Sequence, residues 1–246
     1  MLNQLWNTWG FSVRGPLHRK IGLPNQDSWM ARRYKWGNVI VVSDGLGSKP
    51  HSDRGSMAAC LAVFDAAKCY RNYSKSNFND ILRFLHASWM VKIAPHSPED
   101  CSATCLFAMQ FGDKITIGRL GDGMIAVSPK LGVESVIISD DKQDYFSNQT
   151  DCLESTFQPD KWELMTFDAS DYEAIVLCTD GISDDLIPEK RTAFVQELLA
   201  TYTRMTKQKR SRDLPRWLHA WPVPGHSDDK TIACLYKLEG GSEPGF

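Results

Sequence analysis

Residues 39–48 read Val-Ile-Val-Val-Ser-Asp-Gly-Leu-Gly-Ser, and this stretch decides how the rest of the chain is interpreted. Its four consecutive β-favouring apolar residues predict a buried strand. Asp44 follows the strand, and Gly45 and Gly47 let the backbone turn sharply beside it. A carboxylate at the end of a core strand can offer an oxygen ligand to a cation, but Asp-Gly is also a common turn dipeptide. The stretch alone leaves both interpretations open.

The same arrangement of apolar strand, aspartate and glycine recurs further along the chain. Asp180 follows an apolar run and precedes a glycine, Asp122 stands between two glycines, and Asp228 precedes the last apolar run. Several carboxylates gathered at the rim of one sheet repel one another unless a cation compensates their charge. Oxygen ligands without histidine or cysteine favour Mg²⁺ or Mn²⁺ over zinc.

The order of predicted elements indicates the fold class. Helices are predicted at residues 53–69, 77–94, 186–205 and 214–221, and strands at 9–14, 27–34, 39–43, 103–111, 114–120, 124–127, 133–138, 162–167, 173–179 and 230–237. Residues 15–25 and 139–157 are predicted to be loops. The strands are clustered and joined by hairpins rather than by helices, which favours an α+β fold with antiparallel sheets over a doubly wound parallel fold.

Composition and charge exclude some partners. Hydrophobic residues make up 42% of the 246-residue chain and charged residues 24%, with a net charge of −2 and a pI of about 6.3. This charge balance lacks the excess of positive charge that is typical of nucleic-acid-binding proteins. The basic run at residues 207–212 is more typical of a helix end and a solvated loop than of a nucleic-acid patch. No apolar stretch approaches the ~20 residues needed to span a bilayer, so we expect neither nucleic acid nor membrane as a partner.

Cysteine usage indicates the compartment. The seven cysteines are scattered and odd in number, which favours a reducing compartment. The first ten residues lack the pattern of a signal peptide. No repeat or linker stands out, so we expect a cytoplasmic monomer with a single domain over residues 1–246 and a loose tail at 239–246.

Five short motifs, in order along the chain, resemble those of the metal-dependent type-2C (PPM) serine/threonine protein phosphatases, in the style of their bacterial single-domain members. The motifs are Asn-Gln-Asp-Ser at 25–28, Asp-Gly-Leu-Gly-Ser at 44–48, Gly-Asp-Gly at 121–123, Thr-Asp-Gly at 179–181 and Asp-Asp-Lys-Thr at 228–231. Ser102-Ala103-Thr104 also resembles the family's small-residue strand. The resemblance implies a sandwich of two antiparallel sheets flanked by helices.

The resemblance also implies a site with two Mn²⁺ or Mg²⁺ ions at one edge of the sandwich. It assigns metal ligation to Asp44, which would bridge both ions, to the Gly45 carbonyl, to Asp180 and Asp228 on the first ion, and to Asp122 on a third ion. Asp27 would order the metal-bound waters. The implied reaction is attack of a metal-bridging hydroxide on the phosphorus of a phosphoserine or phosphothreonine.

The chain departs from the family pattern at three places. Gln26 stands where the family often has glutamate, so the second ion would be held more weakly. The usual phosphate-binding arginine is missing, and the interpretation from sequence assigns its role to His18 or Arg19. The family motif reads Gly-Asp-Ser-x-Arg. In this chain Gly123 takes the place of the serine, and Met124 follows it.

Three functions follow from these observations. The leading hypothesis is a metal-dependent hydrolase that dephosphorylates proteins, with a cognate kinase as an expected partner. The departures at Gln26 and at the missing arginine motivate an alternative, a phosphatase-like module that binds a phosphorylated protein without turning it over. A phosphatase for a small phosphoester is the third. Residues 139–157 and 207–224 are the loops in which the resemblance places specificity.

Overall fold

The protein is described here by a computed structural model that covers residues 6–72, 78–132, 134–139 and 150–238. Two five-stranded antiparallel sheets form its centre. One sheet has the order β1 (Trp6–Val13), β10 (Lys230–Lys237), β9 (Tyr172–Cys178), β6 (Met124–Pro129) and β7 (Val136–Ile138). The other has the order β2 (Ser28–Tyr34), β3 (Gly37–Ser43), β4 (Cys105–Phe111), β5 (Lys114–Leu120) and β8 (Glu163–Asp168).

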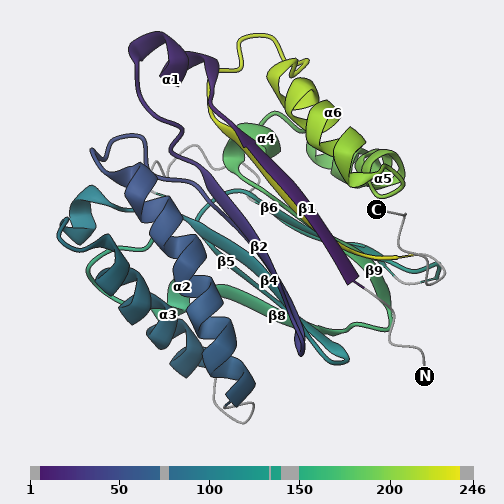
Figure 1. The fold of residues 1–246 in the computed structure, drawn as a ribbon, viewed down its shortest axis with the longest axis horizontal. Helices are drawn as coiled ribbons and strands as arrows, with labels where there is room; N and C mark the ends of the chain where they lie inside the picture. Colours follow the sequence, from purple (N-terminus) through teal and green to yellow (C-terminus); the bar gives the residue numbers. More distant parts are fainter. Residues whose placement is uncertain (1–5, 73–77, 133, 140–149, 239–246) are drawn as a thin grey trace.

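Helices cover the outer face of each sheet, as Figure 1 shows. The long helices α2 (Ser52–Asn72) and α3 (Phe78–Ile93) pack on the sheet that contains β3, and α5 (Arg191–Tyr202) and α6 (Lys207–His219) pack on the sheet that contains β10. This arrangement confirms the predicted α+β sandwich of two antiparallel sheets. No helix among the described residues is both long and apolar enough to span a bilayer.

Strand β3 is buried on both faces, which explains its unbroken apolar sequence. Val39 and Val41 pack against α2 and α3, together with Trp89. Ile40 and Val42 point the other way, into the layer between the two sheets. A strand with side chains alternating between two buried faces has no solvent-facing position for a polar residue. Asp44 directly follows this buried strand and therefore lies at the edge of the sheet.

The helical part of the prediction was wrong at two places. The predicted loop 15–25 contains a short helix, α1 (Pro16–Ile21). Pro16 stands in its first turn, where proline is preorganised, and Gly22, with φ of 79°, ends it in the left-handed region. Residues 207–213 of the predicted loop form the first part of helix α6, which therefore begins before the predicted helix 214–221. Its first turn is capped by the Thr206 hydroxyl, which accepts from the Lys209 amide at 3.3 Å.

The remaining elements are short. Helix α4 (Asp180–Ser183) follows β9, and three 3₁₀ turns lie at η1 (Pro98–Asp100), η2 (Pro159–Lys161) and η3 (Pro188–Lys190). The predicted tail 239–246 and residues 140–149 of the predicted loop 139–157 lie outside the described part of the chain.

Candidate metal centre

Asp44 lies directly after the end of β3 and beside the start of β4, and backbone hydrogen bonds fix its position there. Its backbone amide donates to the Thr104 hydroxyl at 2.9 Å, and the Thr104 amide donates to the Asp44 carbonyl at 2.8 Å. The next residue must be glycine, because a Cβ on Gly45 would lie 2.4 Å from the carbonyl oxygen of Ser52, at the start of α2. The Gly45 amide donates to the Gln26 carbonyl at 3.1 Å, which brings the first acidic motif alongside.

Three of the recurring aspartates meet at this edge of the sandwich. Carboxylate oxygens of Asp44, Asp122 and Asp180 lie within 4.8 Å of one another. They come from the end of β3, from the turn between β5 and β6, and from the first turn of α4. They line a cavity of about 390 Å³, which Asp228 also lines.

Asp27 lies beside this group and is held from two directions. The Thr179 hydroxyl donates to its carboxylate at 2.8 Å, and its backbone amide donates to the Asn25 side-chain oxygen at 3.1 Å. Asp27 is buried, so its position is set by the protein rather than by solvent. Thr179 also accepts a hydrogen bond from the Thr231 amide, which ties the site to β10.

Burial and mutual repulsion raise the pKa of three of these carboxyls, those of Asp27, Asp44 and Asp180. Burial is the largest cause in each case. It raises the pKa of Asp27 to about 7 and, with the charges of Asp122 and Asp228, that of Asp180 to about 8. Burial and the charges of Asp27 and Asp180 raise the pKa of Asp44 well above its ordinary value. A cation between these groups would relieve both the desolvation and the repulsion.

The residues at this edge fit a hard divalent cation. All the acidic groups offer oxygen, the ligand that Mg²⁺ and Mn²⁺ prefer. Gln26, which also lines this cavity, gives a second indication of a cation site. Its buried Oε1 accepts no hydrogen bond from any other described residue. Buried acceptors are normally satisfied, and a water on a hydrated cation could donate to this one.

Asp228 and Asp229 have different surroundings. Asp229 is buried and accepts hydrogen bonds from the Gly15 amide at 2.6 Å, the Gln26 amide at 2.6 Å and His18 Nδ1 at 2.9 Å. Its oxygens are therefore used in holding α1 and the first acidic motif. Asp228 is exposed at the cavity, where its carboxylate remains accessible. Sequence reasoning missed the role of Asp229, since nothing in an Asp-Asp pair tells which member turns inward.

His18 and Arg19, the two candidates for the role of the missing arginine, have different surroundings. His18 is buried, lines the cavity and contacts Asp229. Arg19 is exposed, and its guanidinium lies 3.1 Å from His219 Nδ1 at the end of α6. Arg19 is absent from the described residues that line the cavity, whereas Gly45 is among them.

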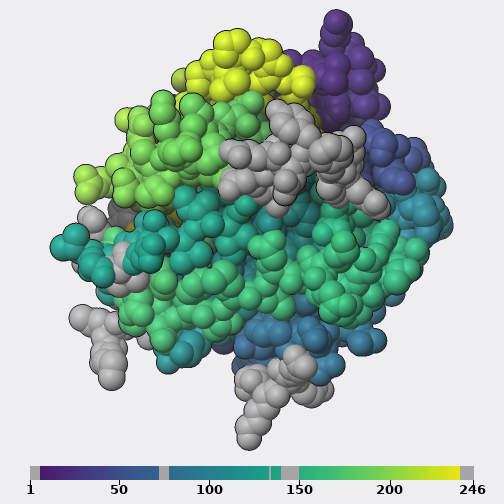
Figure 2. Space-filling view, turned by 180° about the vertical axis from the view of Figure 1, so that it is seen from behind, coloured from purple at the N-terminus to yellow at the C-terminus, as the bar shows by residue number. Residues whose placement is uncertain are grey.

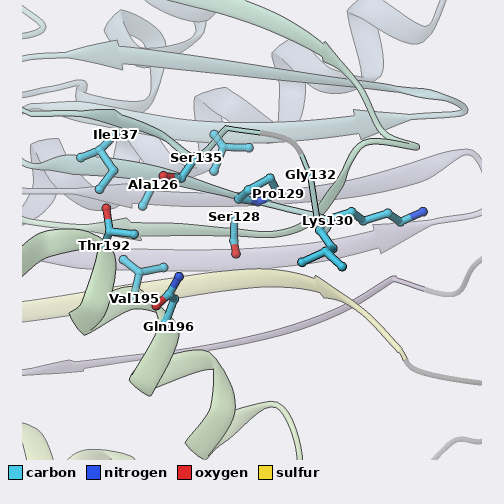
Figure 3. A pocket seen from close by; sticks show the side chains of 12 residues that line it. Ala126, Ser128, Pro129, Lys130, Gly132, Ser135, Ile137, Thr192, Val195 and Gln196 are labelled. Carbon is cyan, nitrogen blue, oxygen red and sulfur yellow. The ribbon is translucent and has the colours of Figure 1, made fainter.

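A second cavity, of about 350 Å³, lies between the β6–β7 hairpin and α5. Its lining includes Ser128, Ser135, Thr192 and Gln196, and Figure 3 shows these side chains around it. The described residues that line it carry no carboxylate or imidazole. The described lining of this second cavity therefore lacks the carboxylate ligands that a hard cation prefers.

The fold and the acidic cavity define a helix-flanked β-sandwich with a candidate metal centre at one edge. The family model for protein phosphatase 2C matches residues 14–219. The chain belongs to the protein phosphatase 2C family.

Solved structures share the fold. The serine/threonine phosphatase Stp1 from Staphylococcus aureus is 16% identical, with a TM-score of 0.64 over 97% of each chain. RsbX in complex with magnesium is 16% identical, with a TM-score of 0.59 over 97% of this chain and 98% of that one. A C. elegans sex-determining protein is 14% identical, with a TM-score of 0.66 over 94% of this chain and 64% of that one. A comparison with curated proteins found no match. At these identities the structures establish the fold alone.

Proposed function

We propose that this protein is a divalent-metal-dependent phosphatase that hydrolyses phosphoserine and phosphothreonine in proteins. One observation carries the proposal: carboxylates from three separate elements converge within 4.8 Å in a cavity of a protein phosphatase 2C family member. The position of Asp44 among them is fixed by backbone hydrogen bonds and by the close approach at Gly45. Repulsive clusters of this kind are retained where a cation is to be bound.

Asp44, the Gly45 carbonyl, Asp180 and Asp228 would hold two Mn²⁺ or Mg²⁺ ions, and Asp122 is available to a third. When bound, the ions supply Lewis-acid activation of water and compensation of charge on the phosphoryl oxygens. These assignments are the ones that the family resemblance implies, and their support here is that all five residues line the same cavity.

The chain's own residues supply the positioning. Asp27, held by Thr179, can accept a hydrogen bond from a water molecule and orient it toward the substrate phosphorus. Because the Asp229 carboxylate only accepts, we assign the donor hydrogen of His18 to Nδ1. Nε2 can donate to a phosphoryl oxygen only if it also carries a hydrogen, so this contact uses the imidazolium form of His18, in which Nδ1 donates to Asp229 and Nε2 to the phosphate. His18 is therefore the proposed phosphate contact, in preference to Arg19.

The test is hydrolysis of p-nitrophenyl phosphate and of a phosphothreonine peptide by the purified protein with Mn²⁺, with Mg²⁺ and with EDTA. We expect turnover with either ion, loss of turnover in EDTA, and loss in Asp180→Asn and Asp44→Asn proteins that keep the wild-type circular dichroism spectrum. Comparable activity in those variants, or in EDTA, would refute the proposal.

A specific observation favours a second candidate, a module that binds a phosphorylated protein without hydrolysing it. Gln26 contributes a neutral amide where the family often has a carboxylate, which lowers the negative charge available to a second ion. Calorimetry with Mn²⁺ separates the two candidates. Saturable Mn²⁺ binding together with turnover supports the phosphatase, and a folded protein that neither binds Mn²⁺ nor turns over substrate supports the binding module.

A further inference from the structure

Helix α6 presents a stripe of basic side chains to solvent. Lys209, Arg212, Arg216 and His219 are all exposed, and their spacing of three, four and three residues places them on one face of the helix. The buried residues of α6, Arg210, Leu214 and Leu218, lie on the other face. We call the four exposed residues the basic stripe. Asp213, the one acidic residue of α6, lies at its edge.

The stripe is not explained by the stability of the fold. The first turn of α6 contains basic residues and no acidic one, although the helix dipole favours negative charge at this end. The side chains of Lys209, Arg212 and Arg216 form no ion pair or hydrogen bond with another described residue. Only Lys209 of the stripe lies in that first turn, whereas Arg216 and His219 lie in the last turn, where the dipole favours positive charge. Because no described residue pairs with the side chains of Lys209, Arg212 and Arg216, these cations are available to a partner.

The stripe leads to the mouth of the aspartate cavity. The last of its residues, His219, lies 3.1 Å from the Arg19 guanidinium, and Arg19 follows His18, which lines the cavity. Figure 1 shows the C-terminal end of α6 directed toward α1, and Figure 2 shows yellow atoms from the C-terminal part of the chain beside the purple segment at the top of the molecule. From Lys209 to His219 the helix rises about 15 Å. An extended peptide of about five residues spans that length.

We propose that the basic stripe and Arg19 form a docking track for an acidic segment that flanks the phosphorylated residue of the substrate protein. This inference rests on the proposed phosphatase function and adds a substrate class to it. The interior of the cavity is strongly acidic, so acidic flanking residues are repelled there and attracted by the cations at its rim. Substrates with Asp or Glu within about five to eight residues of the phosphorylated residue are favoured, given the rise of the helix.

The experiment compares three phosphothreonine peptides of equal length. One has neutral flanks, one has an acidic segment before the phosphothreonine and one has it after. The proteins are the wild type, an Arg212→Gln/Arg216→Gln variant, and a control variant, Arg33→Gln/Lys35→Gln. The control removes two exposed charges from the β2–β3 hairpin, at the end of the strands away from Asp27. Circular dichroism checks the fold of each variant.

We expect at least one acidic peptide to exceed the neutral peptide about tenfold in kcat/KM with the wild type, because long-range attraction raises association. In the α6 variant the acidic peptide exceeds the neutral peptide by no more than about twofold in kcat/KM. In the control variant the wild-type ratio is retained. The ratio also falls between low and high salt, because added ions screen exposed charges. A wild-type ratio near one, or an unchanged ratio in the α6 variant, would overturn the docking track.

Binding measurements separate failure of this inference from failure of the proposed function. Fluorescence anisotropy with labelled acidic peptide uses the Asp180→Asn protein, and the same protein with Arg212→Gln/Arg216→Gln, so no turnover is needed. Weaker binding in the α6 variant supports the docking track even if no peptide is hydrolysed by the wild type. Equal binding overturns it, and so does tighter binding of a single-stranded oligonucleotide, which would assign the stripe to nucleic acid.

Discussion

Replacing Asp180 by asparagine should stabilise the metal-free protein while it abolishes activity. The amide has nearly the shape of the carboxyl group but stays neutral at every pH. In the folded protein, burial and neighbouring charges raise the pKa of Asp180 from 3.8 to about 8. A carboxyl group whose pKa is raised by folding favours the fold when protonated. Its contribution is complete below about pH 4 and is lost as the pH rises through about 8.

The magnitude follows from the size of that pKa change. Each pH unit between the ordinary and the folded value corresponds to about 1.4 kcal/mol, so the wild-type carboxylate costs at most about 6 kcal/mol above pH 8. Asp27, Asp44 and Asp180 titrate together, and protons shared among them lower the cost of ionising any one. We therefore expect Asp180→Asn to raise the free energy of unfolding by about 1–3 kcal/mol at pH 8.5 and by almost nothing near pH 4.5.

The assay is urea unfolding in EDTA between pH 4.5 and 8.5, with Asp113→Asn as the matched control. Asp113 is exposed on the β4–β5 turn, so its substitution should produce no gain that grows with pH. With saturating Mn²⁺ the wild type should become more stable to urea than the variant, because the wild type gains the free energy of metal binding and the variant does not. A variant that is less stable than the wild type in EDTA at pH 8.5, or equally stable at every pH, would refute the reasoning.

Three further predictions concern single residues. Gly45→Ala should lower the free energy of unfolding by about 1–3 kcal/mol in urea titration, because the new Cβ would lie 2.4 Å from the Ser52 carbonyl oxygen; wild-type stability would contradict this. Trp89→Phe removes a buried indole whose N–H donates to a backbone carbonyl at 3.1 Å, and thermal unfolding should show a loss of about 1–3 kcal/mol, whereas an unchanged Tm would show that this bond is dispensable. His18→Ala should lower kcat/KM for p-nitrophenyl phosphate at least about tenfold and Arg19→Ala less than about threefold; the opposite order would assign the phosphate contact to Arg19.

Local sequence patterns predict most of the framework. The continuous apolar run of β3 and the hairpin signals between strands predicted antiparallel sheets, because burial on both faces and tight turns leave a local signature. The aspartates at 44, 122 and 180 were singled out for the same reason, since each follows an apolar strand and adjoins glycine. That three of their carboxylate oxygens lie within 4.8 Å of one another depends on strands far apart in the chain.

The roles of the segments at the rim of the cavity depend on contacts between residues far apart in the chain. Helix α6 has a hydrophilic sequence, and its helical form depends on the Thr206 cap and on burying Leu214 and Leu218 against the β10 sheet. Asp228 and Asp229 are neighbours in sequence, yet one faces the cavity and the other bonds to Gly15, Gln26 and His18, more than 200 residues away. Local sequence cannot encode such choices, because long-range burial and hydrogen bonding set them. The pairing of Arg19 with His219 arises in the same way and joins α6 to the mouth of the cavity.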